Sequence, residues 1–451
     1  MGRAAARAGR VKVVHILHQY PPEFRGGTES CVQSLAAAQR ARGDEVLVIA
    51  GSDLRCDPAP AQDEAGAEAR GDARSAARGA APIGAQGEVR RERVDGIEVL
   101  RVLRRTGENY SMDYRLPRVA EQVLALVGRA APDVVHLHHT LNLSADLGAR
   151  LAAAGHVVVA TLHDFTAVCA RFFLVRPDGQ SCERAFPLPS GRCVECVLPD
   201  FPAGRAALER ELHGRQHTAA AEAAACALAI VPRETIRARW LRSGLFAPER
   251  LVTLPHAVAL AARAPAAPRD RADGRLVLAT WGHLAPAKGV LDLLAAMRLV
   301  RDERLALLAL GEPTDAEHAE ALLDAAEGLD VSFRGRFTAD DLPALRGEAD
   351  IAVFPSRAEE TFGLVVAEAR ALGFPVIASD RGALPEGVGA AGAVVAAADP
   401  VALAHLLAAL LADPSPLAGW SAAARDELLD PAAHADAVAA LYARALAETR
   451  R

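Results

Sequence analysis

Two carboxylates and one lysine are the side chains of this chain whose types and spacing indicate chemistry. Glu360 and Glu368 lie eight residues apart, and Lys288 lies in the run GHLAPAKG. Carboxylates accept hydrogen bonds from hydroxyl groups, and a lysine ammonium is a compact positive charge that binds phosphate. Sugar and ribose are the usual hydroxyl-rich partners of phosphate, so the combination favours a nucleotide-sugar ligand. Lysine is also rare, because Lys12 and Lys288 are the only lysines among 51 basic residues.

The stretch over residues 350–380 holds both carboxylates and reads as strand, loop, helix, turn and strand. An apolar run ends at Pro355-Ser356, and a helical pattern follows Phe362-Gly363. This order predicts a parallel crossover unit, in which ligands lie beyond the carboxyl ends of strands, near the free N–H groups of helix N-termini. If Glu360 lies in the loop, Glu368 falls in the second turn of the helix. If both lie in the helix, they are about 80° apart around its axis.

Other candidates also lie where predicted strands end. Lys288, before a helix N-terminus, suits a diphosphate, although a surface turn with a solvated lysine is the alternative. Gly26 and Gly27 occupy the corresponding loop near the N-terminus, where they let the backbone approach the same ligand or simply form a turn. His163, beside Asp164, is a candidate for contact with the reacting sugar, the alternative being a structural or exposed histidine. The same alternatives apply to a histidine group at another strand end, His136, His138 and His139.

Two successive runs of alternating strands and helices predict an α/β protein with two doubly wound, Rossmann-like domains facing across a cleft. We expect the first domain over residues 1–265, a linker over 266–274, the second domain over 275–430, and a final helix over 431–451 that could cross back to the first domain. Within the first domain, residues 57–88 are rich in small and polar residues and predict a disordered insertion, and residues 165–204 form a cysteine-bearing loop segment. The expected strands are 11–17, 45–50, 97–102, 133–138, 157–162, 227–231, 250–254, 276–280, 305–310, 330–333, 351–354, 376–378 and 393–395.

Composition limits the classes of partner. The chain is 51% hydrophobic and 24% charged, as in soluble globular proteins, and no segment has the apolar length of a membrane span. Residues from Arg275 onward include 15 basic and 26 acidic side chains, and the preceding ones include 36 and 31, so the balances are −11 and +5. Without a concentrated basic face, nucleic acid is not an expected partner. The positive N-terminal half allows contact with an anionic acceptor or a membrane surface, unless it reflects only solvated arginines. We expect a cytoplasmic location, with peripheral contact at the inner face of the membrane as an option.

The chain resembles the retaining glycosyltransferases of family four (glycosyl transferases group 1), which have the GT-B fold. The string PSRAEETFGLVVAEARALGFPVIASD, which starts at Pro355, resembles the signature of that family. GHLAPAKG resembles its diphosphate loop, PPEFRGGTE its N-terminal glycine loop, and DVVHLHH and TLHDF two strand ends that line its cleft. The run PEG over 385–387 fits the following turn, and the likeness covers nearly the whole chain except residues 57–86.

The resemblance implies a role for each candidate. Lys288 would neutralise the diphosphate, and Glu368 would take the ribose hydroxyls. Glu360 would hold hydroxyls of the transferred sugar, and His163 would face its anomeric carbon. Backbone N–H groups would assist from Phe362, Gly363 and Leu364. Members of the family work without a catalytic metal, so no cofactor is expected for catalysis, and stabilisation of the leaving group would be the main contribution of the protein.

The sequence therefore predicts a hexosyltransferase-type enzyme that moves a sugar from a nucleoside diphosphate sugar to an unidentified sugar or lipid-linked acceptor, as in cell-surface polysaccharide or glycolipid synthesis. Two positions depart from the family. His283 stands where an arginine is usual at the diphosphate, so the second positive charge there depends on pH, and His256-Ala257 replaces a common Asn-Gly. The alternatives are a nucleotide-sugar epimerase of the same fold and a non-catalytic nucleotide-sugar-binding subunit.

A second candidate site consists of four cysteines within 28 residues, namely Cys169, Cys182, Cys193 and Cys196. Four thiolates that converge from loops suit a structural zinc, which would stabilise a segment without a core of its own. The spacing of the first three is looser than in compact zinc modules, so disulfides, an iron–sulfur cluster and free thiols remain alternatives. The other three cysteines read as ordinary buried or incidental thiols: Cys31, Cys56 and Cys226.

Overall fold

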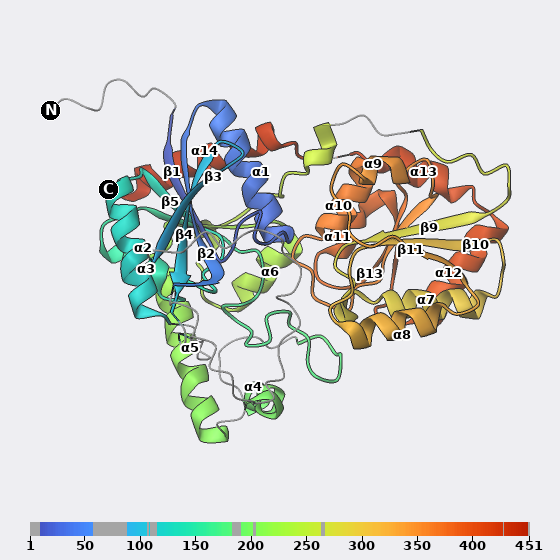
Figure 1. Cartoon of the computed structure of the whole chain (residues 1–451), viewed down its shortest axis with the longest axis horizontal. Helices are drawn as coiled ribbons and strands as arrows, with labels where there is room; N and C mark the ends of the chain where they lie inside the picture. Colours follow the sequence, from blue (N-terminus) through green and yellow to red (C-terminus); the bar gives the residue numbers. More distant parts are fainter. Residues whose placement is uncertain are drawn as a thin grey trace, which may run out of the picture.

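The computed structural model describes residues 10–56, 88–105, 108, 115–182, 191–201, 204–262, 267–426 and 428–449. It shows two α/β domains side by side, the N-terminal one in blue to green and the C-terminal one in yellow to red (Figure 1). The insertion predicted over residues 57–88 lies outside the described residues, apart from Glu88.

The N-terminal domain is built on an eight-stranded sheet of order β3-β4-β2-β1-β5-β6-β7-β8. Neighbouring strands are parallel except for β3, which pairs antiparallel with β4. Strand β3 was not predicted, because its residues, VRRERV, are mostly charged and lie at the sheet edge, where burial imposes no apolar pattern. The strands are β1 (Lys12–Leu17), β2 (Glu45–Arg55), β3 (Val89–Val94), β4 (Ile97–Arg104), β5 (Val134–Leu137), β6 (Val158–Thr161), β7 (Leu228–Val231) and β8 (Leu251–Thr253). The helices are α1 (Gly27–Arg42), α2 (Pro117–Ala130), α3 (Leu147–Ala153), α4 (Gly191–Val197), α5 (Arg205–Ala225) and α6 (Glu234–Arg242).

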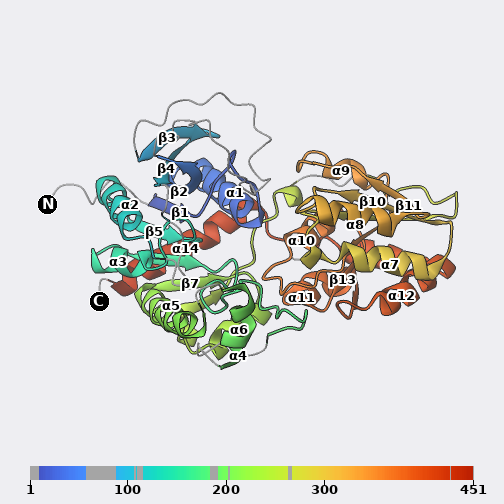
Figure 2. The same cartoon turned by 60° about the horizontal axis from the view of Figure 1, so that its bottom comes forward.

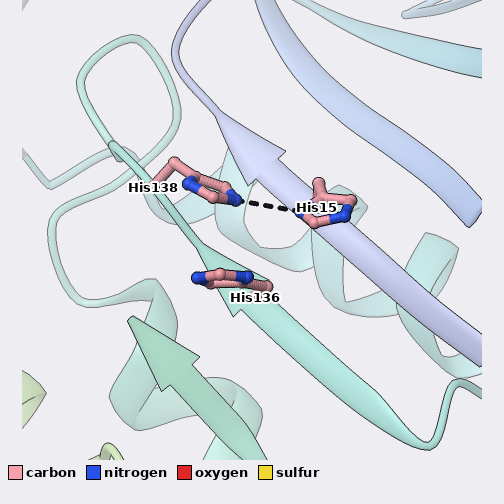
Figure 3. A group of neighbouring side chains, drawn as sticks. All are labelled: His15, His136 and His138. Atoms are coloured by element: carbon pink, nitrogen blue, oxygen red, sulfur yellow. Dashed lines mark hydrogen bonds between the residues drawn. The ribbon is translucent and has the colours of Figure 1, made fainter. Parts of the chain in front are cut away.

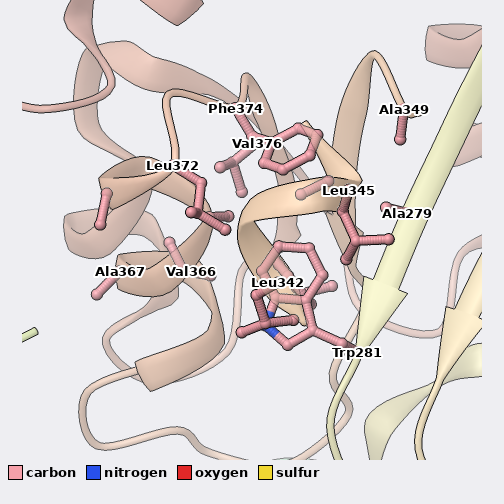
Figure 4. Close-up of a cluster of buried hydrophobic side chains, with 14 of the residues drawn as sticks. Ala279, Trp281, Leu342, Leu345, Ala349, Val366, Ala367, Leu372, Phe374 and Val376 are labelled. Carbon is pink, nitrogen blue, oxygen red and sulfur yellow. The ribbon is translucent and has the colours of Figure 1, made fainter. Parts of the chain in front are cut away.

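The C-terminal domain has a six-stranded parallel sheet of order β11-β10-β9-β12-β13-β14. Its central strands are continuous apolar runs because helices cover both faces. On one face Trp281 packs among side chains that include Leu342, Val366 and Phe374 (Figure 4). The strands are β9 (Leu276–Trp281), β10 (Leu305–Leu310), β11 (Asp330–Phe333), β12 (Ile351–Phe354), β13 (Val376–Ser379) and β14 (Gly392–Val395). The helices of this domain are α7 (Val290–Val300), α8 (Ala316–Ala326), α9 (Leu342–Leu345), α10 (Leu364–Ala371), α11 (Leu384–Val388), α12 (Pro400–Ala412) and α13 (Pro416–Ala423), and α14 (Pro431–Thr449) follows them in the chain.

Each sheet has one point at which the strand order reverses. Strand β9 lies between β10 and β12, and strand β1 lies between β2 and β5. At such a point the connecting helices run to opposite faces, which leaves a crevice beyond the carboxyl ends of the two strands. The loops after β9, β12, β1 and β5 are therefore the natural places for a ligand.

The last helix, α14, lies in the N-terminal domain, where it appears in red beside the blue elements (Figures 1 and 2). Its buried face, which includes Val438 and Tyr442, packs against Val13, Leu35 and Val159. The C-terminal end of the chain thus forms part of the core of the first domain.

Within the described residues, no single helix has both the length and the apolar composition needed to cross a membrane. Helices α12 and α13 reach that length and composition only when they are taken together, and the chain bends by 106° between them.

Candidate active site

Lys288 and Glu360 meet at the point where the C-terminal sheet reverses its strand order. Lys288 Nζ lies 2.5 Å from Glu360 Oε1, and Ser356 Oγ lies 2.9 Å from the same oxygen. The two loops are in close contact, because a Cβ atom on Gly289 would lie 2.0 Å from the carbonyl oxygen of Pro355 and the φ angle there is +72°. Glycine is therefore required at Gly289 for the lysine loop to reach the carboxylate loop.

Glu360 lies in the loop before α10, and Glu368 lies in the second turn of that helix. Trp281, the last residue of β9, donates a hydrogen bond from Nε1 to Glu368 Oε2 at 3.0 Å. Burial raises the pKa of Glu368 to about 7, although the indole hydrogen bond opposes the shift. This carboxyl group therefore changes its charge near neutral pH.

The remaining candidates of the C-terminal domain lie around the same two loops. His283 follows β9 and is exposed. Gly363 precedes α10 with a φ angle of +71°, and a Cβ there would lie 2.6 Å from Leu384. Leu364 begins the helix, so its N–H group precedes the first intrahelical hydrogen bonds.

The glycines of the first domain lie at the start of α1. Gly26 donates its N–H to Glu29 Oε2 at 2.9 Å, and a Cβ on Gly26 would lie 2.7 Å from that oxygen. A Cβ on Gly27 would meet nothing within 4 Å. A side chain at position 26 would therefore collide with Glu29, whereas position 27 has room for one.

Side chains of the two domains contact one another beside Glu360. Thr361 Oγ1 donates to the carbonyl oxygen of His163 at 2.5 Å. The buried ring of Phe362 lies 5.0 Å from that of His256, and the Arg233 guanidinium lies 4.7 Å from the Phe362 ring centre. No function was predicted for Arg233, although it stands just after the end of β7, where a ligand-facing residue is expected.

Two further carboxylates connect the domains. Glu359 accepts a hydrogen bond from Ser181 Oγ, and its Oε2 lies 3.1 Å from Arg239 Nη2 in an ion pair. Glu386, in the first turn of α11, accepts from the backbone N–H groups of Glu234 and Thr235 at 3.1 and 2.9 Å. Glu386 thus caps the N-terminus of α6 from the other domain. Neither role was predicted, because each depends on a contact between residues far apart in sequence.

A chain of buried polar side chains ends at His163. His163 Nε2 lies 3.0 Å from His138 Nδ1, His138 Nε2 lies 2.9 Å from His15 Nδ1, and His15 Nε2 lies 2.7 Å from Gln39 Oε1. His15 lies on β1, and His138 directly follows the neighbouring strand β5 (Figure 3). The network continues through Gln39 Nε2 to Tyr442 Oη (3.3 Å), on to His136 Nδ1 (2.6 Å), and from His136 Nε2 to Thr161 Oγ1 (2.7 Å).

Burial keeps the histidines of this chain neutral. It lowers the pKa of His15 to about 4 and that of His163 to about 3, and it places those of His136 and His138 well below the usual value. A neutral imidazole has one donor and one acceptor nitrogen. Since Gln39 Oε1 accepts from His15, each histidine in turn donates from Nε2, and His163 is left with an unprotonated Nδ1.

The ring nitrogens of His15, His136 and His138 lie within 4.8 Å of one another, a spacing that could also hold a metal ion. Both nitrogens of His136, however, already bond to Tyr442 and Thr161. The hydrogen-bonded chain therefore accounts for the whole group without a metal.

Beside this chain, His139 and Asp164 form an ion pair with Nε2 and Oδ2 2.8 Å apart. Burial alone would lower the pKa of His139, but Asp164 outweighs it and the pKa is raised. In the same way, His139 overcomes burial and holds the pKa of Asp164 well below its usual range. The ionised Asp164 of this pair directly follows the neutral His163 in the chain.

The four predicted cysteine ligands share one cavity, although no three of their sulfur atoms, all within the described residues, lie within 4.8 Å of one another. Cys169, Cys182, Cys193 and Cys196 line one cavity in the segment between β6 and α5. All seven cysteines lie in the described part of the chain, and no disulfide bond joins them.

Two family models match the chain. The model described as Glycosyltransferase Family 4 matches residues 25–262, and the one described as Glycosyl transferases group 1 matches residues 275–413. Among curated proteins, a D-inositol 3-phosphate glycosyltransferase of Salinispora tropica is 39% identical over 151 residues, which are 30% of this chain and 31% of that protein. The chain aligns with only about a third of the length of the curated relatives that match it first.

Solved structures resemble nearly the whole chain. Sucrose-phosphate synthase from Thermosynechococcus elongatus covers 97% of the chain, and all of that structure is matched, with a TM-score of 0.66 and 20% identity. Anabaena Alr3699/HepE in complex with UDP covers 96%, again over its full length, with a TM-score of 0.63 and 16% identity. These likenesses and the two facing α/β domains establish the GT-B fold. Because a family model covers more than half of the chain, this protein belongs to glycosyltransferase family 4.

Proposed function

We propose that this protein transfers a sugar from a nucleoside diphosphate sugar to an acceptor hydroxyl with retention of anomeric configuration. The observation that carries the proposal is the meeting of Lys288 and Glu360 at the reversal point of the C-terminal sheet, with Glu368 on the adjoining helix. Phosphate, sugar and ribose would each find a matching group there. The bound UDP of the structurally similar Alr3699/HepE supports a nucleotide ligand.

The ion pair between Lys288 and Glu360 suggests how the donor enters. A diphosphate would bind Lys288 and separate it from Glu360, and the carboxylate would then accept hydrogen bonds from the sugar hydroxyls. Cleavage of the bond between the anomeric carbon and the phosphate oxygen places negative charge on the leaving diphosphate. Lys288 and the N-terminal N–H groups of α10 would stabilise that charge.

His163 would orient the sugar without acting as an acid or a general base. Its Nε2 proton is donated to His138, and its low pKa keeps the ring neutral. The unprotonated Nδ1 is then available to accept a hydrogen bond from a sugar hydroxyl. In a retaining displacement on one face of the sugar, the proton of the acceptor hydroxyl leaves with the diphosphate, so His163 need not remove it.

We place the acceptor in a cavity of the first domain beside His163. The cavity is lined by polar residues that include His139, Asp164 and Thr166 and by apolar ones that include Trp240 and Phe246. Such walls suit a sugar or polyol, which has hydroxyl groups at its edge and C–H groups on its faces. Retention is proposed from the signature around Glu360 and Glu368.

The first test is a thermal-shift titration with UDP, GDP, ADP and dTDP. A nucleotide at about 100 times its dissociation constant should add about 2.7 kcal/mol to the free energy of unfolding. Lys288→Ala should abolish this stabilisation. The matched control is Lys12→Ala, which removes the only other lysine and its surface ion pair with Glu45. Failure of all four nucleotides to stabilise the wild-type protein would contradict the proposed donor site.

Turnover is tested separately, with the nucleotide sugar that carries the stabilising base. Release of the nucleoside diphosphate, slowed at least tenfold in Glu360→Gln, would support transferase chemistry. The coupling constant of the anomeric proton in the product distinguishes retention from inversion. Tight nucleotide binding without turnover would instead favour a non-catalytic binding protein, and conversion of the donor sugar without transfer would favour an epimerase.

A further inference from the structure

The cysteine segment folds so that four cysteines line one cavity. Residues Val175 and Ser181 pair as an antiparallel bridge around a turn at Gly179, where φ is +77°. This hairpin returns the chain to its starting point, and Cys182 donates its backbone N–H to the Leu174 carbonyl at 2.6 Å. Cys182 is thereby brought to the cavity that Cys169 also lines.

The other two cysteines come from α4. Cys193 and Cys196 are three residues apart in this single short helix, so their side chains lie on the same face. Helix α4 is held by a small apolar cluster in which Val194 and Val197 contact Leu208 and Leu212 of α5. Both cysteines of the pair line the same cavity as Cys169 and Cys182.

The surroundings of the four thiols favour an anionic metal centre. A divalent ion with four thiolates carries a net charge of −2, and Arg171 and Arg192 line the same cavity, as does Arg176, which is paired with Asp178. No disulfide joins the cysteines. The segment also has little apolar core of its own, which is the situation in which a structural metal contributes folding free energy.

The hairpin also reaches the loop that carries Glu360. Ser181 Oγ, one residue before Cys182, donates to Glu359 Oε1, and Glu359 donates its backbone N–H to the Phe173 carbonyl at 3.4 Å. The position of the hairpin therefore affects the residue next to Glu360.

We propose that Cys169, Cys182, Cys193 and Cys196 bind one structural Zn²⁺ ion, which holds the hairpin against the Glu359–Glu360 loop. The four thiols lose their protons on binding, and the ion is tetrahedrally coordinated with no open position for substrate. The zinc site rests on the cavity that the four cysteines share and on their chemistry, and their sulfur atoms would draw closer on binding. Its effect on donor binding rests on the proposed function.

Metal content of the full-length protein tests the site directly. Inductively coupled plasma mass spectrometry should find one zinc per chain in the wild type and none in Cys193→Ser/Cys196→Ser. The control Cys56→Ser/Cys226→Ala, which alters cysteines outside the cavity, should keep the zinc. Wild-type protein that lacks zinc, contains iron, or shows disulfides among the four cysteines by mass spectrometry would overturn the proposal.

A cobalt experiment tests the site in the wild-type protein, so its result does not depend on whether the cysteine variants fold. Wild-type protein produced with cobalt should show the visible absorption of tetrahedral thiolate-bound Co²⁺, and added zinc should abolish it. Absorption typical of six-coordinate cobalt would contradict a four-thiolate site.

A separate variant tests whether the contact between the hairpin and Glu359 affects donor binding. Ser181→Ala removes the hydroxyl that contacts Glu359 and leaves all four cysteines intact. It should retain one zinc per chain but bind the stabilising nucleotide about two- to tenfold more weakly. Unchanged nucleotide affinity would refute the link while leaving the zinc site standing, and absence of nucleotide binding in the wild type would count against the donor site instead.

Discussion

Burial sets the protonation states of the side chains at the domain junction. His163 is neutral because its ring is removed from water and hydrogen-bonded to another neutral histidine. The same desolvation acts in the opposite direction on Glu368, whose pKa is raised to about 7. With the ordinary pKa values of their residue types, His163 would be partly protonated at neutral pH and Glu368 would be fully ionised.

The state of Glu368 predicts a pH-dependent affinity for nucleotide. Ribose hydroxyls donate hydrogen bonds, so they favour the ionised carboxylate over the protonated form. Nucleotide affinity should therefore rise as the pH increases through about 7 and then level off. Calorimetric titration with the stabilising nucleotide across this range measures the effect.

Glu368→Gln is the matched variant, because it keeps the shape and the hydrogen bond from Trp281 but does not titrate. Its nucleotide affinity should be lower and flat with pH. A wild-type affinity that is constant through neutral pH, or that falls as the pH rises, would show that Glu368 does not bind ribose as a carboxylate.

At the scale of elements, α14 connects the end of the chain to the histidines of the cleft. Tyr442 links Gln39 on α1 to His136 on β5, and all three side chains are buried. The helix thus completes a hydrogen-bonded chain that leads to His163, in addition to covering apolar side chains of the first domain.

Tyr442→Phe should lower the free energy of unfolding by about 1–3 kcal/mol, because it leaves His136 Nδ1 and Gln39 Nε2 buried without their partner. Denaturant unfolding followed by circular dichroism measures the loss. Tyr20→Phe is the control, since the buried Tyr20 hydroxyl has no hydrogen-bond partner within the described residues. Equal effects of the two variants would show that the network adds nothing beyond packing.

At the scale of the whole molecule, the two domains meet through a few polar contacts near the donor loop. Glu359, Thr361 and Glu386 of the second domain each bond to the first. Contacts of this kind are weak individually, so the equilibrium between closed and open arrangements should respond to the loss of one of them.

Glu386→Ala should favour an open arrangement. It removes the cap on α6, which is worth about 1 kcal/mol, or about a fivefold change in the ratio of closed to open molecules. Small-angle X-ray scattering should show a larger radius of gyration, and nucleotide affinity should fall.

Asp315→Ala is the comparison variant, because Asp315 caps α8 within a single domain by accepting from the His318 N–H at 2.8 Å. It should lose stability without a change in the radius of gyration. If both variants scatter alike, the Glu386 contact does not control how the domains close.

The sequence by itself determined the two α/β domains, the positions of Lys288 and Glu360 in loops after strands, and that of Glu368 in the helix that follows. Apolar strands and the turns that follow them are local features, and a parallel sheet places every strand end at the same edge. The tertiary structure alone decided which distant groups meet. It joined Trp281 to Glu368 and Glu386 to the N-terminus of α6, and it linked Gln39 and Tyr442 into one chain, 403 residues apart in sequence. It also set the charge of His163 and Glu368, because a pKa depends on the solvent that folding removes and on neighbours that only folding supplies.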